Sequence, residues 1–146
     1  MNKRILSILV ENTAGVLSRV SGLFSRRGYN IDSITAGVTA DSRFTRITIV
    51  SSGDEIILSQ IEKQIAKLED VIVVKVLKPE ESVYRELILV KIRANAQQRS
   101  EIVSIADIFR AKIVDAERES LVIELTGTQS KLEAFLQLLD GYEILE

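Results

Sequence analysis

Residues 4–28 decide the fold, and they read RILSILVENTAGVLSRVSGLFSRRG. In residues 4–11 every second side chain shares one apolar face, the period that is typical of a β-strand. A break follows at residues 12–15. From Val16 onward, apolar residues recur at spacings of three and four, which predicts an amphipathic helix. The helix should end before Gly28, a residue suited to a left-handed C-terminal cap.

The rest of the first half adds two strands, a second helix and a last strand. Alternating patterns predict strands at residues 31–39 and 44–51, joined by a short turn. Asp54 is a natural N-cap for the next helix, whose apolar stripe has the helical period. Residues 71–77 are apolar enough for a fourth strand. The order βαββαβ is that of a split βαβ, or ferredoxin-like, unit.

The same order of elements repeats after a short linker, residues 78–82, which contains the only proline of the chain. The pattern beyond it predicts a strand at 84–93, a helix around 102–109, a hairpin of 112–116 and 121–126, a helix around 132–139 and a short strand at 142–145. We therefore predict an α+β fold of two tandem ferredoxin-like βαββαβ domains, at residues 1–77 and 83–146.

Composition argues against several classes of function. The chain of 146 residues is 46% hydrophobic and 27% charged, with a net charge of −2, and it lacks the basic excess of a nucleic-acid binder. It contains no Cys and no His, so thiolate chemistry and the commonest general base and metal ligand are absent. Carboxylate-only catalysis or a Mg²⁺ site stays open in principle. We expect no catalytic residue and no metal site.

Hydrophobic stretches and the N-terminus predict a cytoplasmic protein. Apolar runs such as Val71–Val74 are far shorter than the roughly 20 residues that cross a bilayer. The first four residues lead into only a few apolar residues before Glu11, too few for a signal peptide. We therefore expect neither a membrane nor a nucleic acid as a partner.

The junction of the first strand and first helix is the candidate binding site. A helix start presents unpaired backbone N–H groups and a partial positive charge, which suit a carboxylate. Gly15 would let a ligand approach the backbone closely, and Asn12 offers a donor and an acceptor beside it. The alternative is structural: Asn12 or Thr13 caps the helix, and Gly15 permits a tight turn.

Self-association is expected because each half is small. Domains of about 70 residues draw limited stability from one core. Ile5, Leu9 and Val50 remain apolar on the sheet face that the helices do not cover. Pairing of sheet edges or faces would bury such surface, so a homodimer is the expected minimum.

Sequence motifs along the whole chain resemble those of acetolactate synthase small regulatory subunits. They are RILSILVEN (4–12), GVLSRV (15–20), GLFSRRGYNI (22–31), QIEKQ (60–64), ELILVKI (86–92), IFRAKIVD (108–115) and TGTQSKLEAF (126–135). The resemblance implies an N-terminal ACT domain and a C-terminal ACT-like domain. Members of that family usually run on past the last helix with a further strand and tail, whereas this chain ends at Glu146, so the last strand of the second domain is expected to be incomplete.

The resemblance implies a non-catalytic subunit that confers feedback inhibition by valine or another branched-chain amino acid. Such an effector lies at the interface of two ACT domains, and the matching positions here are Asn12, Gly15, Val16 and Leu17 of one chain with Asn30 and Ile31 of its partner. Residues 83–146 would contact and activate the large catalytic subunit. That subunit would hold thiamine diphosphate, Mg²⁺ and FAD, and this chain would hold no cofactor.

Other functions stay open on the sequence. One is a free-standing amino-acid sensor of the ACT type with another partner. A second, from a different class, is a small acylphosphatase-like enzyme that uses an Arg and an Asn. RNA recognition on this fold relies on aromatic residues of the central strands, and residues 4–11 and 45–51 contain none. The choice among valine, leucine and isoleucine also stays open, because one methylene in an apolar pocket is worth only about 1–3 kcal/mol.

Overall fold

The structure is a computed structural model that describes residues 2–146. The chain divides into two compact units. The first unit ends at Ser82, and the second begins at Val83. Each unit has its own sheet and its own hydrophobic core.

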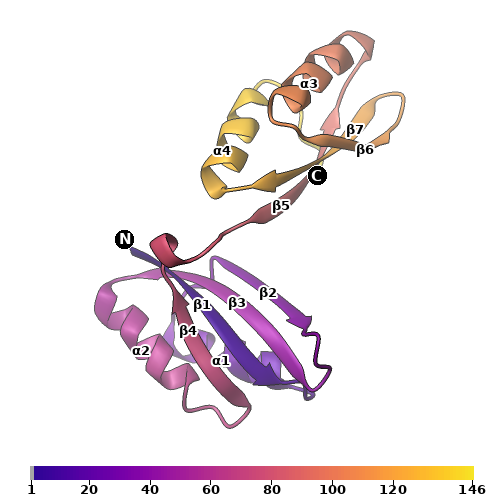
Figure 1. Ribbon diagram of the computed structural model, residues 1–146. Coiled ribbons are helices and arrows are strands. Elements are labelled where there is room, and N and C mark those ends of the chain that lie inside the picture. Colours follow the sequence, from indigo (N-terminus) through magenta and orange to yellow (C-terminus); the bar gives the residue numbers. More distant parts are fainter. Residues whose placement is uncertain (1) are drawn as a thin grey trace. The chain divides into compact units, whose positions relative to one another are not determined.

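The first unit is a four-stranded antiparallel sheet with both helices on one face (Figure 1). The sheet order is β2-β3-β1-β4. Its elements are β1 (Asn2–Glu11), α1 (Val16–Arg27), β2 (Ser33–Val38), β3 (Phe44–Gly53), α2 (Glu55–Ile65) and β4 (Val71–Leu77), followed by a 3-10 turn at Pro79–Glu81.

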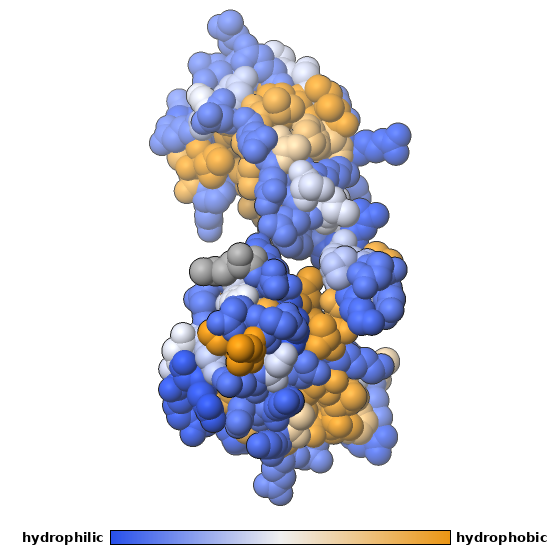
Figure 2. All heavy atoms as spheres, turned by 90° about the vertical axis from the view of Figure 1, so that its left-hand side faces the viewer, coloured by the Kyte–Doolittle hydropathy of each residue, from blue (hydrophilic) through white to orange (hydrophobic). Residues whose placement is uncertain are grey.

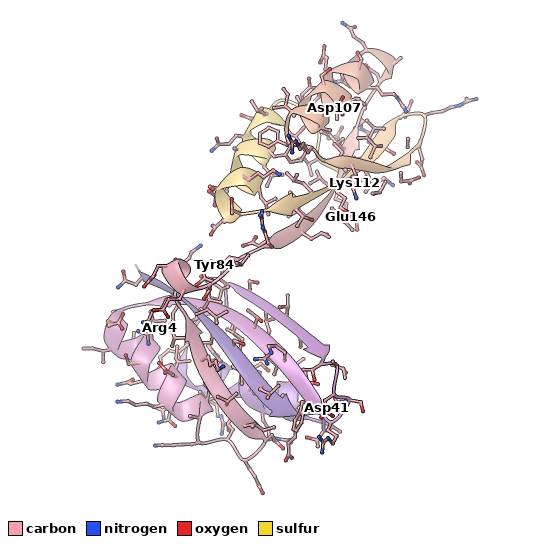
Figure 3. The ribbon with its side chains drawn as sticks, in the orientation of Figure 1. Arg4, Asp41, Tyr84, Asp107, Lys112 and Glu146 are labelled. Atoms are coloured by element: carbon pink, nitrogen blue, oxygen red, sulfur yellow. The ribbon has the colours of Figure 1, made fainter. Side chains whose placement is uncertain are left out.

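The first core forms where the helices cover the sheet. It is built from alternate residues of the two central strands and from the apolar stripes of both helices: Leu6, Ile8, Val10, Ile47, Ile49, Val16, Val20, Phe24, Leu58, Ile61 and Ile65. Asp54 caps α2 as predicted, because its side chain accepts a hydrogen bond from Ile57 N at 2.8 Å. Arg4, labelled in Figure 3, extends from β1 and forms ion pairs with the carboxylates of Glu55 and Glu62 on α2. This pairing helps to hold α2 against the sheet.

The second unit has a three-stranded antiparallel sheet of order β5-β7-β6. Its elements are β5 (Glu86–Arg93), α3 (Ala96–Ile108), β6 (Lys112–Ala116), β7 (Ser120–Gly127) and α4 (Gln129–Leu138). Asn95 and Gln98 form a reciprocal capping box at the start of α3. Phe109 and Phe135 pack edge-to-face, with ring centroids 5.4 Å apart, beside the buried residues of this core. The predicted α+β class and its repeated architecture are confirmed.

The last predicted strand, residues 142–145, is reduced to an isolated bridge between Ile92 and Ile144. Arg93 N donates to Glu143 O at 2.9 Å, and Leu145 N donates to Lys91 O at 2.8 Å. The segment therefore runs beside β5 without forming a full strand. As expected from the resemblance, the fourth strand of this unit is incomplete, with an isolated bridge and a few backbone hydrogen bonds to β5.

Candidate functional site

Helix α1 begins without a side-chain cap. Its N-cap residue is Gly15, at φ 80°, and no side chain accepts a hydrogen bond from the first turn. The alternative that Asn12 or Thr13 caps this helix is therefore wrong. The other part of that alternative is right, because the left-handed backbone at Gly15 favours glycine. Gly15 thus has a structural role that does not by itself exclude a ligand.

Asn12 is fixed by the hairpin between β2 and β3. Its Nδ2 donates to Ser42 O at 3.0 Å, its Oδ1 accepts from Thr45 Oγ1 at 3.1 Å, and its backbone N donates to Arg43 O at 2.8 Å. An amide oxygen has two acceptor positions, so Oδ1 can accept one further hydrogen bond. The hairpin, whose tip carries Asp41 in Figure 3, therefore orients a side chain that still has capacity for an ammonium group.

The other side of the same loop is held by Asp70, in the turn before β4. Asp70 Oδ2 accepts from Arg19 Nε at 2.6 Å, and its Oδ1 lies 3.5 Å from Thr13 Oγ1. Arg19 Nη2 also donates to Ala14 O at 3.4 Å. Arg19 is not among the site residues predicted from the sequence. Its position four residues after Gly15, where a helix places side chains over the preceding turn, is the signal that would have found it.

The two apolar candidates of this loop differ in exposure. Val16 is 7% exposed and belongs to the first core, and its backbone N–H donates to Thr13 O at 3.4 Å. Leu17 is 45% exposed and offers an apolar side chain at the surface. Of the two apolar side chains predicted to line the binding site in this loop, that of Leu17 is the accessible one.

Asn30 and Ile31 lie beyond the opposite end of α1. The helix has 12 residues, which corresponds to a length of about 18 Å. Asn30 Nδ2 donates to Asp32 Oδ1 at 2.7 Å, and its backbone oxygen accepts from Ser51 Oγ at 2.7 Å. Ile31 packs partly buried against the first core. One chain therefore brings Asn12, Gly15, Val16 and Leu17 together and keeps Asn30 and Ile31 away from them.

Electrostatics at the hairpin tip are set by an exposed ion pair. The hydrogen bonds from Arg43 lower the pKa of the Asp41 carboxyl and raise that of the Arg43 guanidinium.

Among residues 2–146, Asp and Glu side chains form no group of three or more that could hold a metal ion. The helices within this range are also too short or too polar to span a membrane.

Two family models match the chain, one for each unit. A model described as an AHAS small subunit-like ACT domain matches residues 6–73, and one described as the small subunit of acetolactate synthase matches residues 85–146.

Similar proteins span nearly the whole chain. An acetolactate synthase small subunit of Mycolicibacterium smegmatis is 50% identical over 97% of this chain and 83% of its own length. The acetolactate synthase isozyme 3 small subunit of Salmonella typhimurium is 48% identical over 99% of this chain and 89% of its own. A crystal structure of the acetolactate synthase small subunit from Thermotoga maritima is similar with a TM-score of 0.91 and 41% identity, covering 100% of this chain and 91% of that one.

Proposed function

The chain belongs to the family of acetolactate synthase small subunits, and we propose that it is the cytoplasmic regulatory subunit of such an enzyme. In this proposal it carries no catalytic residue. It activates a large catalytic subunit and confers feedback inhibition by valine or another branched-chain amino acid. The thiamine diphosphate, Mg²⁺ and FAD of the reaction belong to the catalytic subunit.

The observation that carries the effector site is the uncapped start of α1 at Gly15, beside an oriented Asn12. The free N–H groups and the dipole of the helix favour the carboxylate of an amino acid. Asn12 Oδ1 can accept from its ammonium group, and Leu17 supplies an apolar contact. Aliphatic amino acids combine these three features, which supports the proposed ligand class.

The effector is shared between two copies of the chain in this proposal. Asn30 lies beyond the far end of α1, so a ligand that contacts both Asn12 and Asn30 must take them from different chains. Antiparallel pairing of the two-fold type places the start of one α1 near the end of the other. The proposed site is therefore complete only in a homodimer.

Strand β2 is the proposed edge of that dimer. It is an edge strand of the sheet, and every residue from Ser33 to Val38 is exposed. Ile34 and Val38, on the helix side of the sheet, are 40% and 59% exposed. Gly22 of α1 has open space where a Cβ would be, which would let a second helix approach closely. An edge with unpaired backbone groups and exposed apolar side chains favours pairing with a second copy.

We assign the contact with the catalytic subunit to residues 83–146, as the resemblance implies. The support from this unit is its exposed apolar surface, with Leu87 and Leu89 on β5 and Ile108 at the end of α3. Figure 2 shows apolar residues gathered at the surface of both units. Such patches mark interaction surfaces in soluble proteins.

Calorimetric titration of the whole chain with valine, leucine and isoleucine tests the effector assignment. Assays of the catalytic subunit with and without the chain then test activation and feedback inhibition. A chain that binds an amino acid but neither binds nor affects the catalytic subunit would be a free-standing sensor. Turnover of an acyl phosphate by the chain alone would favour the acylphosphatase-like alternative.

A further inference from the structure

Arg19 lies over the start of its own helix. Its Nη1 would be only 3.0 Å from a Cβ added to Gly15, so the guanidinium occupies the space that glycine leaves open. The Nε of Arg19 is bound to Asp70, and Nη2 faces Ala14 O. Within residues 2–146, Nη1 makes no hydrogen bond. The free end of the guanidinium therefore lies beside Gly15, next to the uncapped N–H groups.

This placement is unusual for the first turn of a helix. A cation there is repelled by the partial positive charge of the helix start, and acidic residues are preferred instead. The first turn of α1 contains no acidic residue. Two positive sources, the guanidinium and the helix start, thus lie at one loop, where Asp70 is the carboxylate that pairs with Arg19. A second carboxylate would fit this balance of charge.

We propose that Arg19 binds the carboxylate of the effector and that Asp70 positions Arg19 for this contact. The inference rests on the proposed function, since it deepens the site at Gly15. Asp70 holds Nε at 2.6 Å and so directs the Nη1 end toward Gly15. The Nη1 group keeps its N–H donors for a charge-assisted hydrogen bond to a carboxylate, and backbone N–H groups at the helix start supply further donors.

The role of Asp70 follows from its surroundings. Its side chain is mostly buried, at 17% exposed, whereas that of Arg19 is 49% exposed. The Asp70 backbone oxygen also accepts from Glu11 N at 2.9 Å, which ties the turn to the end of β1. Asp70 is therefore the fixed partner of the pair and Arg19 the accessible one. This makes Asp70 a positioning residue and Arg19 a binding residue.

The test compares an amino acid with its amide. Valine has a carboxylate, whereas valinamide keeps the same ammonium and side chain without the negative charge. In calorimetric titrations, Arg19→Gln should weaken valine binding by about tenfold to hundredfold and leave valinamide binding within about twofold. Asp70→Ala should weaken valine binding to a smaller degree, and Asp70→Asn, which keeps an acceptor for Nε, should recover most of the loss.

Lys63→Gln is the matched control, because it removes one exposed positive charge from α2, a helix that takes no part in the proposed site. It should change neither affinity. Equal losses for valine and valinamide in Arg19→Gln, together with a lower melting temperature, would make Arg19 a structural residue and overturn the inference. Unchanged valine binding in Arg19→Gln would overturn it while the proposed function stands. A wild-type chain that binds none of the three branched-chain amino acids would overturn both.

Discussion

Replacement of Asn12 by alanine separates a sensor residue from a residue that only shapes the hairpin. Asn12 makes two side-chain hydrogen bonds to the β2–β3 hairpin, with Ser42 O and Thr45 Oγ1. In the proposed function it also accepts one from the ammonium group of the effector. Asn12→Ala removes all three hydrogen bonds, so the stability of the first unit and its affinity for the effector should both fall.

The structural loss is small because Asn12 is exposed. A hydrogen bond contributes a net of about 0.5–1.5 kcal/mol, and exposed ones lie at the low end, so the two together are worth about 1 kcal/mol. For a domain of this size, that corresponds to a fall in melting temperature of about 4–8 °C. Loss of a partner for a charged group in a closed site costs about 1.5–3 kcal/mol, or roughly tenfold to hundredfold in affinity.

Thr45→Val supplies the matched control. It removes the hydrogen bond from Thr45 Oγ1 to Asn12 Oδ1 and keeps the Asn12 acceptor and the shape of the side chain. Calorimetric titration and thermal unfolding should show a comparable or smaller loss of stability and an affinity within about twofold of wild type. If Asn12→Ala and Thr45→Val lose affinity equally, Asn12 acts through the hairpin and the sensor role is refuted.

Further predictions concern the dimer, the second unit, ligand linkage and pH. Ile34→Lys, at the exposed β2 edge, should shift the protein toward monomer in light scattering, while Ile56→Lys, equally apolar and 72% exposed on α2, should not. Phe135→Ala should destabilise the second unit by about 3–5 kcal/mol in denaturant unfolding, and effector binding in calorimetry should survive because the cores are separate. Effector at a hundredfold excess over its dissociation constant should stabilise the first unit by about 2.7 kcal/mol in the same unfolding experiment. The hydrogen bond to Glu101, at 2.6 Å, raises the pKa of Tyr142 above 10.0, so this bond's stabilisation is present below pH 10 and lost as the pH rises through the folded-state pKa. One of the 3 tyrosines should therefore titrate late in ultraviolet absorbance, and Tyr142→Phe should remove that step.

Most of the fold could be predicted from the sequence because local signals and burial agree. In β1, the apolar residues Leu6, Ile8 and Val10 are buried, and in α1 the residues Val16, Val20 and Phe24 enter the same core. Asp54 and Gly28 mark helix ends through local backbone chemistry, and both act as predicted. The short strand at the end of the chain is the exception. Its sequence pattern predicts a strand, but in the structure it pairs with β5 through an isolated bridge between Ile92 and Ile144.

The candidate site was predicted less completely, because its contacts join residues far apart in sequence. Arg19 and Asp70 are separated by 51 positions, and Asn12 and Thr45 by 33. No local sequence pattern indicates which of two such distant residues will form a hydrogen bond. The predicted role of Val16 shows the same limit, since an apolar residue at a helix start fits either a ligand socket or the core, and here its side chain is buried in the core.

Gly15 serves both the turn before α1 and the proposed binding site. Its positive φ favours glycine, as a turn requires, and the space beside its Cα is taken by Arg19 Nη1. A side chain at this position would therefore strain the backbone and displace the guanidinium, even before any effector is considered. The same two facts leave the helix N–H groups uncapped and bring a cation over them. The features that make Gly15 necessary for the turn are thus the ones that leave room for a carboxylate, and a structural role and a binding role at this residue do not compete.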